Sequence, residues 1–358
     1  MRPDLGRPPA RRLLALAAWL VAFAMVAGCT SVSPDRVTAD RMDYGQVIVE
    51  SWKRQTLLNV VRMRYGDAPV FLDVASVINS YSVGGRANAT ASLPSGIDPN
   101  LFGLLAEGTW SNTPTVTYQP LLGDRFTRSM LHPIPPSAMF QMLQAGWAAE
   151  LVMTTVLNSI NGLRNDSFGA VGDPGFSEVV AGIARIQRTG GLGVRVETRK
   201  DGSAIIFVLR RAEPDAARRE DLRRIRELLM LDDVATEVEV TYGLLPRNNR
   251  ELALLTRSMM EIMLNLGIGV DLPAAHVADG RAMPWRDIAG PNDVPVRIHS
   301  GPTAPVNTYS AVPYKDSWYW IEDTDITSKR TFTFLMILFS LAETGQPPAA
   351  PVVTVPSR

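Results

Sequence analysis

The hydrophobic and polar positions of this chain change period several times, and each change predicts a different kind of element. Residues 46–64 repeat apolar side chains at three- and four-residue spacing, which is typical of an amphipathic helix. Residues 79–93 alternate instead, with Tyr81, Val83 and Ala87 in one set and mostly serine, asparagine and threonine in the other. A period of two predicts a strand with one wet face.

The alternation returns over 106–118 after a turn-rich segment, so the two stretches together predict a long β-hairpin over 79–118. Gly108, Trp110 and Val116 form one set of the second stretch, and mainly threonines form the other. Strands in membranes show such faces, and about 10 residues suffice for one crossing. Soluble antiparallel sheets that pack one face on helices alternate in the same way. Both interpretations stay open, and soluble packing is the commoner.

The rest of the chain predicts helices mixed with short strands. We expect helices over 137–161, 176–188, 216–231, 251–266 and 328–344, and strands over 192–198, 204–209, 237–242, 310–314 and 318–322. The strands occur in hairpins, as around Asp201-Gly202, rather than in strand–helix–strand repeats. This order predicts an α+β fold with mainly antiparallel strands and hairpins packed with several helices.

Two apolar segments near the end could be mistaken for binding or membrane segments. The run over 332–341 is apolar on all sides but, at about ten residues, too short to span a membrane. We therefore expect a buried core helix there. Trp318, Tyr319 and Trp320 belong to a predicted strand, where aromatic side chains usually pack.

The first thirty residues indicate an export signal. Four arginines precede an apolar run over 13–26, and Ala27, Gly28 and Cys29 follow it. A basic start, a short apolar run and small residues at its end are typical of a secretory signal. The run is shorter than the about 20 residues that a membrane-spanning helix needs, which disfavours a permanent transmembrane helix.

The segment Val26-Ala27-Gly28-Cys29 resembles the lipobox of bacterial lipoproteins. In that family the cysteine thiol carries a diacylglycerol and signal peptidase II cleaves before the cysteine, so the resemblance implies membrane attachment through acyl chains on Cys29. Cys29 is the only cysteine, so the chain can form no internal disulfide. Thr30 stands where an aspartate retains enterobacterial lipoproteins in the inner membrane, which favours the outer membrane.

Two further segments, 50–59 and 318–341, are similar to parts of a group of uncharacterised proteobacterial lipoproteins. That resemblance implies a place in the cell envelope and no particular activity. We expect the following order along the chain: a lipoprotein signal peptide (1–28), a lipidated flexible tether (29–45), an N-terminal helix with the long amphipathic hairpin (46–125), an α+β domain (126–345) and a disordered tail (346–358).

The charge of the chain argues against a nucleic-acid partner. The whole chain has a formal net charge of zero, and residues 1–28 contain four arginines and one aspartate, so the mature chain carries 0 − (4 − 1) = −3. Nucleic-acid binding usually needs a basic face. The arginines over 210–226 alternate with acids, and Glu220 and Arg224 have favourable i,i+4 spacing. We expect a solvated charged helix face; contact with anionic lipid head groups is the alternative.

Motifs for catalysis or cofactor binding are missing from the sequence. It has no Gly-x-Ser-x-Gly elbow and no Ser-x-x-Lys pair. The three histidines, His132, His276 and His299, have no second candidate ligand at metal spacing, and we expect surface or capping roles for them. The glycines at 190–193 follow a predicted helix and open a strand, which is the reverse of a dinucleotide-binding fingerprint. We therefore assign no catalytic residue and expect no cofactor.

The best metal candidate is the acidic run of Glu322, Asp323 and Asp325. Closely spaced carboxylates can bind a hard cation, but this run lacks the glycine and the distal glutamate of a calcium loop. It lies where a strand meets the last helix, and acidic side chains at a helix start cap and stabilise it. Capping is the preferred interpretation.

Three functions stay open at this point. The first is a non-enzymatic, lipid-anchored envelope protein that faces the periplasm and works through contacts with envelope proteins or with copies of itself. The second is an oligomeric outer-membrane channel or secretion component that uses the 79–118 hairpin. The third is an envelope hydrolase whose site cannot be recognised from the sequence.

Overall fold

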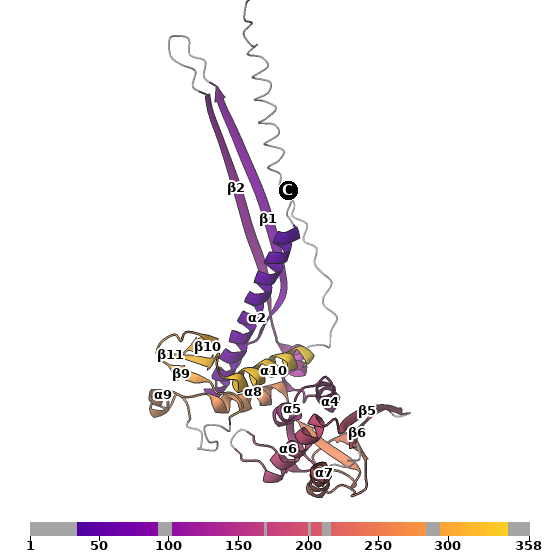
Figure 1. Ribbon diagram of the computed structural model, residues 1–358. Helices are drawn as coiled ribbons and strands as arrows, with labels where there is room; N and C mark the ends of the chain where they lie inside the picture. The colour runs from indigo at the N-terminus through magenta and orange to yellow at the C-terminus, as the bar shows by residue number, and fades with distance from the viewer. Residues whose placement is uncertain are drawn as a thin grey trace, which may run out of the picture. The chain divides into compact units, whose positions relative to one another are not determined.

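The computed structural model describes residues 34–91, 102–167, 170–199, 202–209, 216–283 and 294–342. The chain divides into two compact units, 1–52 and 53–358. Helix α2 (Pro34–Arg64) supplies the described part of the first unit and continues into the second. Val26, Ala27, Gly28 and Cys29 lie outside the described residues. Figure 1 shows helices combined with separate sheets, which confirms the expected α+β class.

The largest sheet of the described residues has six strands in the order β4-β3-β8-β7-β6-β5. These are β3 (Leu157–Ile160), β4 (Leu163–Arg164), β5 (Leu192–Arg199), β6 (Gly202–Leu209), β7 (Glu237–Tyr242) and β8 (Glu251–Thr256). β7 and β8 run parallel, whereas the other neighbours run antiparallel. The helices α4 (Pro136–Gln144), α5 (Ala149–Val156) and α6 (Pro174–Arg188) contact these strands, and α7 (Ala216–Leu228) packs on α6.

Helix α6 shows how the hydrophobic pattern builds this layer. Val179, Ile183 and Ile186 recur at helical spacing and are buried. Gly182 lies on the side that meets α7, where an added Cβ would come within 3.1 Å of the Ile225 side chain. A residue without a side chain therefore allows the two helices to approach closely.

A second, three-stranded sheet has the order β10-β11-β9, with β9 (His299–Gly301), β10 (Thr308–Tyr314) and β11 (Ser317–Glu322). This half of the chain also contains α8 (Met259–Leu266), the 3-10 turn η2 (Gly267–Gly269), α9 (Ala274–Ala278) and α10 (Ile326–Ala342). Tyr319 of β11 and Phe332, Phe334 and Leu335 of α10 are fully buried, which confirms the expected core helix and packed aromatic strand. None of the described helices is both long and apolar enough to span a membrane.

The strands β1 (Leu72–Ala91) and β2 (Phe102–Pro120) pair only with each other among the described strands. Figure 1 shows them as a long two-stranded ribbon, followed in the chain by α3 (Gly123–Phe126) and the π-helix η1 (Thr127–Leu131). At about 3.4 Å per residue, each strand extends about 65 Å. The hairpin expected over 79–118 is confirmed, and it reaches further toward its base than the alternation indicated.

The first helix begins earlier than the apolar pattern predicts, at Pro34 rather than at residue 46. Residues 34–45 of the expected flexible tether are therefore helical, whereas 29–33 lie outside the described part. Proline suits a first helical position because its missing N–H has no partner there in any helix. The segment is mostly polar and charged, so no apolar stripe marked it as a helix.

The single helix predicted over 137–161 is wrong. The chain forms α4, breaks at Gly146 with a φ of 93°, and then forms α5 and the strand β3. Asn161 and Gly162 have φ values of 46° and 84° and join β3 to β4. Two positive φ angles are those of a type I′ hairpin turn, for which Asn-Gly is the favoured pair.

The helix predicted over 251–266 is wrong in its first half, which is β8 at the centre of the large sheet. Ser258 then caps α8, because its Oγ accepts a hydrogen bond of 3.2 Å from the Glu261 N–H. Ser258 and Glu261 have the spacing of a capping box, so the sequence does contain the signal for the later start. The other predicted helices and strands after residue 170 agree to within three residues at either end.

Candidate functional site

The base of the β1–β2 ribbon is tied to α2 by two side-chain amides. Gln55 bonds both backbone groups of Leu72, at 3.0 Å to its oxygen and 2.8 Å from its nitrogen. Asn59 bonds both backbone groups of Val70 in the same way, at 2.8 and 2.9 Å. Each side-chain amide thus makes the pair of hydrogen bonds that a neighbouring strand would otherwise make, and it fixes where β1 begins. In the unit that starts at Lys53, no other described helix or strand packs along β1 or β2.

The register of the ribbon brings the two alternating patterns together. Val83 lies opposite Trp110, and Ala87 lies opposite Ala106. Residues opposite each other in an antiparallel pair share a face. One face therefore carries the positions Val77, Asn79, Tyr81, Val83, Gly85, Ala87, Ala89 and Ala91 of β1, and Phe102, Leu104, Ala106, Gly108, Trp110, Asn112, Pro114 and Val116 of β2. We call it the uncharged face, because none of these residues carries a charge at neutral pH.

The opposite face of the ribbon is polar and carries one charge of each sign. Serine and threonine occupy half of its positions over 78–90 and 103–115, including Ser82 opposite Ser111. Arg86 lies opposite Glu107, so the two charges share one step of the register. The sequence alone did not establish that the apolar sets of both strands fall on one face, because this depends on the register.

A buried tyrosine–histidine network lies where α2 ends. Tyr65 Oη is 2.5 Å from Nδ1 of His276 in α9 and 2.5 Å from Oη of Tyr319 in β11. A hydroxyl has one proton, so Tyr65 donates to one partner and accepts from the other. Burial raises the pKa of Tyr319, which keeps that hydroxyl protonated, so it can donate a hydrogen bond or accept one.

This network is closed to solvent. Tyr319 is fully buried and only 3% of His276 is exposed, so the three rings join α2, α9 and β11 without offering a surface to a substrate. The surface or capping role expected for His276 is wrong, because its ring lies in the core. Tyr65 is 211 residues away from His276 and 254 residues away from Tyr319 in the sequence, and no local pattern signals a contact over such separations.

A second group of polar side chains lies beside the network, at the turn between β10 and β11. The Tyr314 hydroxyl donates to Asp67 Oδ2, and Lys315 Nζ lies 3.0 Å from the same oxygen. These bonds hold the pKa of Asp67 below its ordinary value, and the bond from Tyr314 has the larger effect. Burial, followed by the bond to Asp67, raises the pKa of Tyr314 to about 12. Lys315 also lies 4.9 Å from the centre of the Tyr65 ring.

The other two histidines lie elsewhere. His132 lines a cavity of about 230 Å³ together with Arg128 of η1 and apolar residues that include Met259 and Leu338. His299 of β9 is exposed in part, with Nδ1 3.4 Å from Asp271 Oδ2. The structure therefore does not bring the three histidines into one site.

The acidic run after β11 adopts the capping arrangement. Asp325 Oδ1 accepts from the Ser328 N–H at 3.0 Å, and Oδ2 accepts from the Ser328 hydroxyl at 2.6 Å, at the start of α10. Asp323 instead binds Lys329 Nζ at 2.6 Å, and Glu322 ends β11. Burial acts to raise the pKa of Asp325, but the bonds from Ser328 outweigh it and the pKa lies below its ordinary value. Across the described ranges, no three His, Cys, Asp or Glu side chains are grouped to hold a metal ion.

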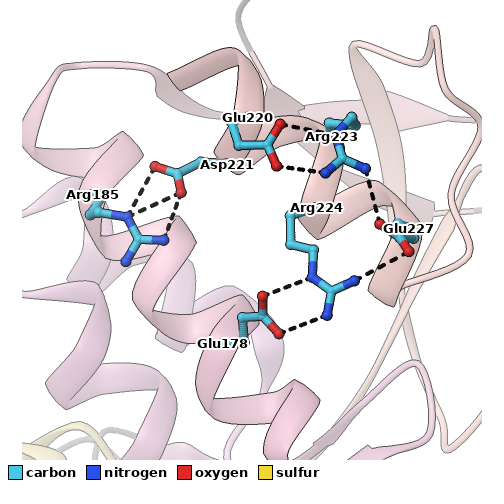
Figure 2. A network of polar contacts seen from close by, with 7 residues as sticks. All are labelled: Glu178, Arg185, Glu220, Asp221, Arg223, Arg224 and Glu227. Carbon is cyan, nitrogen blue, oxygen red and sulfur yellow. Dashed lines mark hydrogen bonds and ion pairs between the residues drawn. The ribbon is translucent and has the colours of Figure 1, made fainter. Parts of the chain in front are cut away.

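The arginines of α7 bind acids on the surface, as expected for a solvated charged face (Figure 2). Arg224 Nε lies 2.7 Å from Glu178 Oε1 of α6, and its Nη1 lies 3.2 Å from Glu227 Oε1. Arg185 of α6 binds Asp221 of α7 at 2.6 Å. These pairs connect the two helices across their exposed edges.

One detail of the charged face differs from the sequence expectation. Glu220 binds Arg223, three residues along, at 2.5 Å rather than the expected Arg224. Arg224 instead donates to Glu178, a residue 46 positions earlier in the chain. Arg210 and Arg211 lie outside the described residues. The arginines of Figure 2 are already neutralised within the protein, which disfavours their use for anionic head groups.

Arg257, which follows β8, is a buried cation held by backbone carbonyls. Nη1 donates to the Thr154 oxygen at 3.0 Å, and Nη2 donates to the Asp166 oxygen. Only 3% of Arg257 is exposed, and burial lowers its pKa to about 10. Thr154 belongs to the last turn of α5, whose carbonyls carry partial negative charge. Arg257 therefore ties the end of α5 to the loop at 165–167.

No protein-family model, curated protein or solved structure matches this chain. The candidate functional surface is the β1–β2 ribbon, because the polar clusters described above bind partners within the protein, whereas the ribbon has two strand edges that pair with no other described strand.

Proposed function

We propose that this chain is a lipid-anchored component of the bacterial cell envelope that faces the periplasm and acts through protein contacts rather than catalysis. The lipobox-like segment ending at Cys29 supports attachment to the membrane by acyl chains, and Thr30 supports the outer membrane. Two or more acyl chains give stable attachment, at about 0.8 kcal/mol for each buried methylene.

The observation that carries the contact role is the ribbon of β1 and β2. Its strands have 20 and 19 residues, and no other described strand pairs with them. An unpaired strand edge presents a row of backbone donors and acceptors that another strand can complete. Such a long edge supports binding by strand addition, in which the main chain supplies the hydrogen bonds.

The polar clusters support contacts over catalysis. The Tyr65 network is buried, Asp325 caps α10, and the arginines of α7 are paired with acids. Each of these groups has a structural use within the fold. None of them places a nucleophile beside a base at an open surface.

A second candidate function is an outer-membrane channel or secretion component, and the spacing of aromatic positions on the ribbon favours it. Tyr81 and Phe102 lie on the uncharged face, and Phe102 lies opposite Ala91, ten residues beyond Tyr81. Ten residues at about 3.4 Å each, tilted by about 40°, rise about 26 Å. Outer-membrane strands carry an apolar band about 25 Å tall between aromatic girdles.

The mass of the mature N-terminus tests the anchor. The full chain is expressed in a Gram-negative host, and the purified protein is expected to start at Cys29 with acyl chains attached. A Cys29→Ser variant should lose the acyl mass and leave the outer-membrane fraction. A free thiol at position 29, or an uncleaved leader, would contradict the proposal.

A further inference from the structure

We propose that the ribbons of separate copies of this chain join edge to edge, with β1 of one copy beside β2 of the next, in one shared antiparallel sheet. The inference rests on the proposed contact role and names the partner, which is a second copy of this chain.

The proline in β2 shows which backbone groups of the ribbon point outward. Residues along an antiparallel pair alternate between those whose N–H and C=O point to the partner and those whose groups point outward. Pro114 has no N–H, so it fits the ladder only at an outward position. Pro114 lies opposite Asn79 on the uncharged face. The outward-pointing backbone groups of both strands therefore belong to the residues of the uncharged face.

This backbone arrangement determines how two copies can pair. When two copies pair, the outward residues of β1 bond the outward residues of β2 in the next copy, and bonded residues opposite each other share a face. Since both outward rows belong to the uncharged face, that face continues from copy to copy in every register that satisfies the hydrogen bonds. The polar faces are aligned in the same way. A second copy therefore matches both edges without any change of sequence.

The outward-pointing N–H and C=O groups form an unbroken row in each strand over the stretch that would pair with the next copy. From Phe102 to Asn112 in β2, and from Asn79 to Ala91 in β1, no residue is a proline. The shift in the register at Val74/Ser76 lies near the base, outside both stretches. Each copy can thus present two unbroken rows of donors and acceptors.

Charge and stability also favour the shared sheet. Arg86 and Glu107 share one step of the polar face, so each added copy brings one charge of each sign and no net charge. An isolated two-stranded hairpin is at best marginally stable in water, and independent stability needs three or more strands with a hydrophobic face or packing against a helix. Neighbouring copies would supply the missing strands.

Cysteine cross-linking in the full, lipidated chain tests the proposal. Polar-face residues of adjacent copies are expected to lie at non-hydrogen-bonded positions, where Cα atoms are about 4.5 Å apart and disulfides fit. Two differently tagged variants, Ser82→Cys in β1 and Ser111→Cys in β2, are expressed together. Ser80→Cys and Thr113→Cys extend the panel to neighbouring registers. Cys29 is expected to be acylated in all of them and so unable to cross-link.

We expect disulfide-linked dimers that carry both tags in at least one β1–β2 combination, and none when a variant is expressed alone. A Val234→Cys variant serves as the control and measures how often disulfides form by random collision. Val234 precedes β7 and is 71% exposed. Mixed dimers no more frequent than with this control, or dimers within one variant only, would overturn the proposal. Acylation of Cys29 is measured in the same samples, so a missing cross-link in an acylated protein refutes the shared sheet and leaves the anchor standing.

Discussion

Val83 lies directly opposite Trp110 in the β1–β2 register, and both positions belong to the uncharged face of the ribbon. Each strand's alternation could be recognised from the sequence. That the two apolar sets coincide on one face is a property of the register, and it turns two amphipathic strands into one amphipathic ribbon.

A charge in the middle of the uncharged face should weaken association, whereas a charge on the polar face should not. We expect Ala87→Lys to reduce the association constant by tenfold or more, since a lysine on the lipid-facing side of a membrane strand costs about 2 kcal/mol near the middle of the bilayer. Asn88→Lys, one residue along on the polar face, is the matched control. Analytical ultracentrifugation of the lipidated proteins in detergent measures both. An equal fall of the association constant in the two variants would show that the two faces do not differ in their effect on association.

Removal of the Tyr65 hydroxyl should destabilise the protein. Tyr65→Phe leaves His276 Nδ1 and the Tyr319 hydroxyl without their shared partner in the core, which costs about 1–3 kcal/mol. Tyr309→Phe is the matched control, because its hydroxyl bonds Thr333 at 3.0 Å at the surface. Urea unfolding should show a clearly larger loss for Tyr65→Phe, and a similar loss for both would argue against the buried network.

Arg257 should matter far more than an arginine at the surface. Arg257→Ala leaves the Thr154 and Asp166 carbonyls without their donor and opens a cavity, so we expect a loss of about 3 kcal/mol or more. Arg250→Ala, which breaks an exposed pair with Asp232, should cost less than about 1 kcal/mol. Thermal or urea unfolding compares the two, and a loss below 1 kcal/mol for Arg257→Ala would contradict its structural role.

Asn161 has a positive φ and also makes buried hydrogen bonds. Two substitutions distinguish the effect of the backbone strain on stability from the effect of the lost bonds. Its side chain bonds the Leu229 oxygen at 2.8 Å and accepts from the Ala253 N–H at 2.7 Å, while its φ is 46°. Asn161→Gly and Asn161→Ala both lose the bonds, but only alanine is strained at a positive φ. We expect alanine to be the less stable variant by about 1 kcal/mol in urea unfolding. Equal stabilities would show that the turn relaxes.

How far the sequence predicts this fold depends on whether the signal is local. The strands β5 and β6 and the helix α6 follow from hydrophobic period and turn residues. The first half of 251–266 was predicted as a helix because an apolar run has the same composition in a buried strand, and only its place between β3 and β7 decides. The Asn161-Gly162 turn could have been recognised, because that dipeptide is a strong hairpin signal.

The polar contacts were harder to predict than the elements. The cap by Asp325 followed from its place before a helix. Tyr65, His276 and Tyr319 come from three separate elements, so their contact depends on packing that no local pattern encodes. The same holds for Arg257, whose carbonyl partners can be found only once α5 and β8 are in place.

The pair of Tyr314 and Asp67 should make stability depend on alkaline pH. The pKa of Tyr314 is raised from 10.0 to about 12 in the folded protein. A raised pKa stabilises the fold fully below the unfolded value, and this contribution is lost as the pH rises through the folded value. The stability difference between the wild type and Tyr314→Phe should therefore stay constant from pH 7 to 10 and shrink between pH 10 and 12. A difference that does not change up to pH 12 would contradict the shift.

The mass of the lipidated protein in detergent tests the role of the ribbon most directly. The comparison is with a variant in which residues 81–112 are replaced by Asn-Gly, so that Ser80 and Thr113, which lie opposite each other, flank a two-residue turn. Light scattering should give the wild type the mass of several copies and the shortened variant the mass of one. A monomeric wild type, or an oligomer of unchanged size after shortening, would contradict the account.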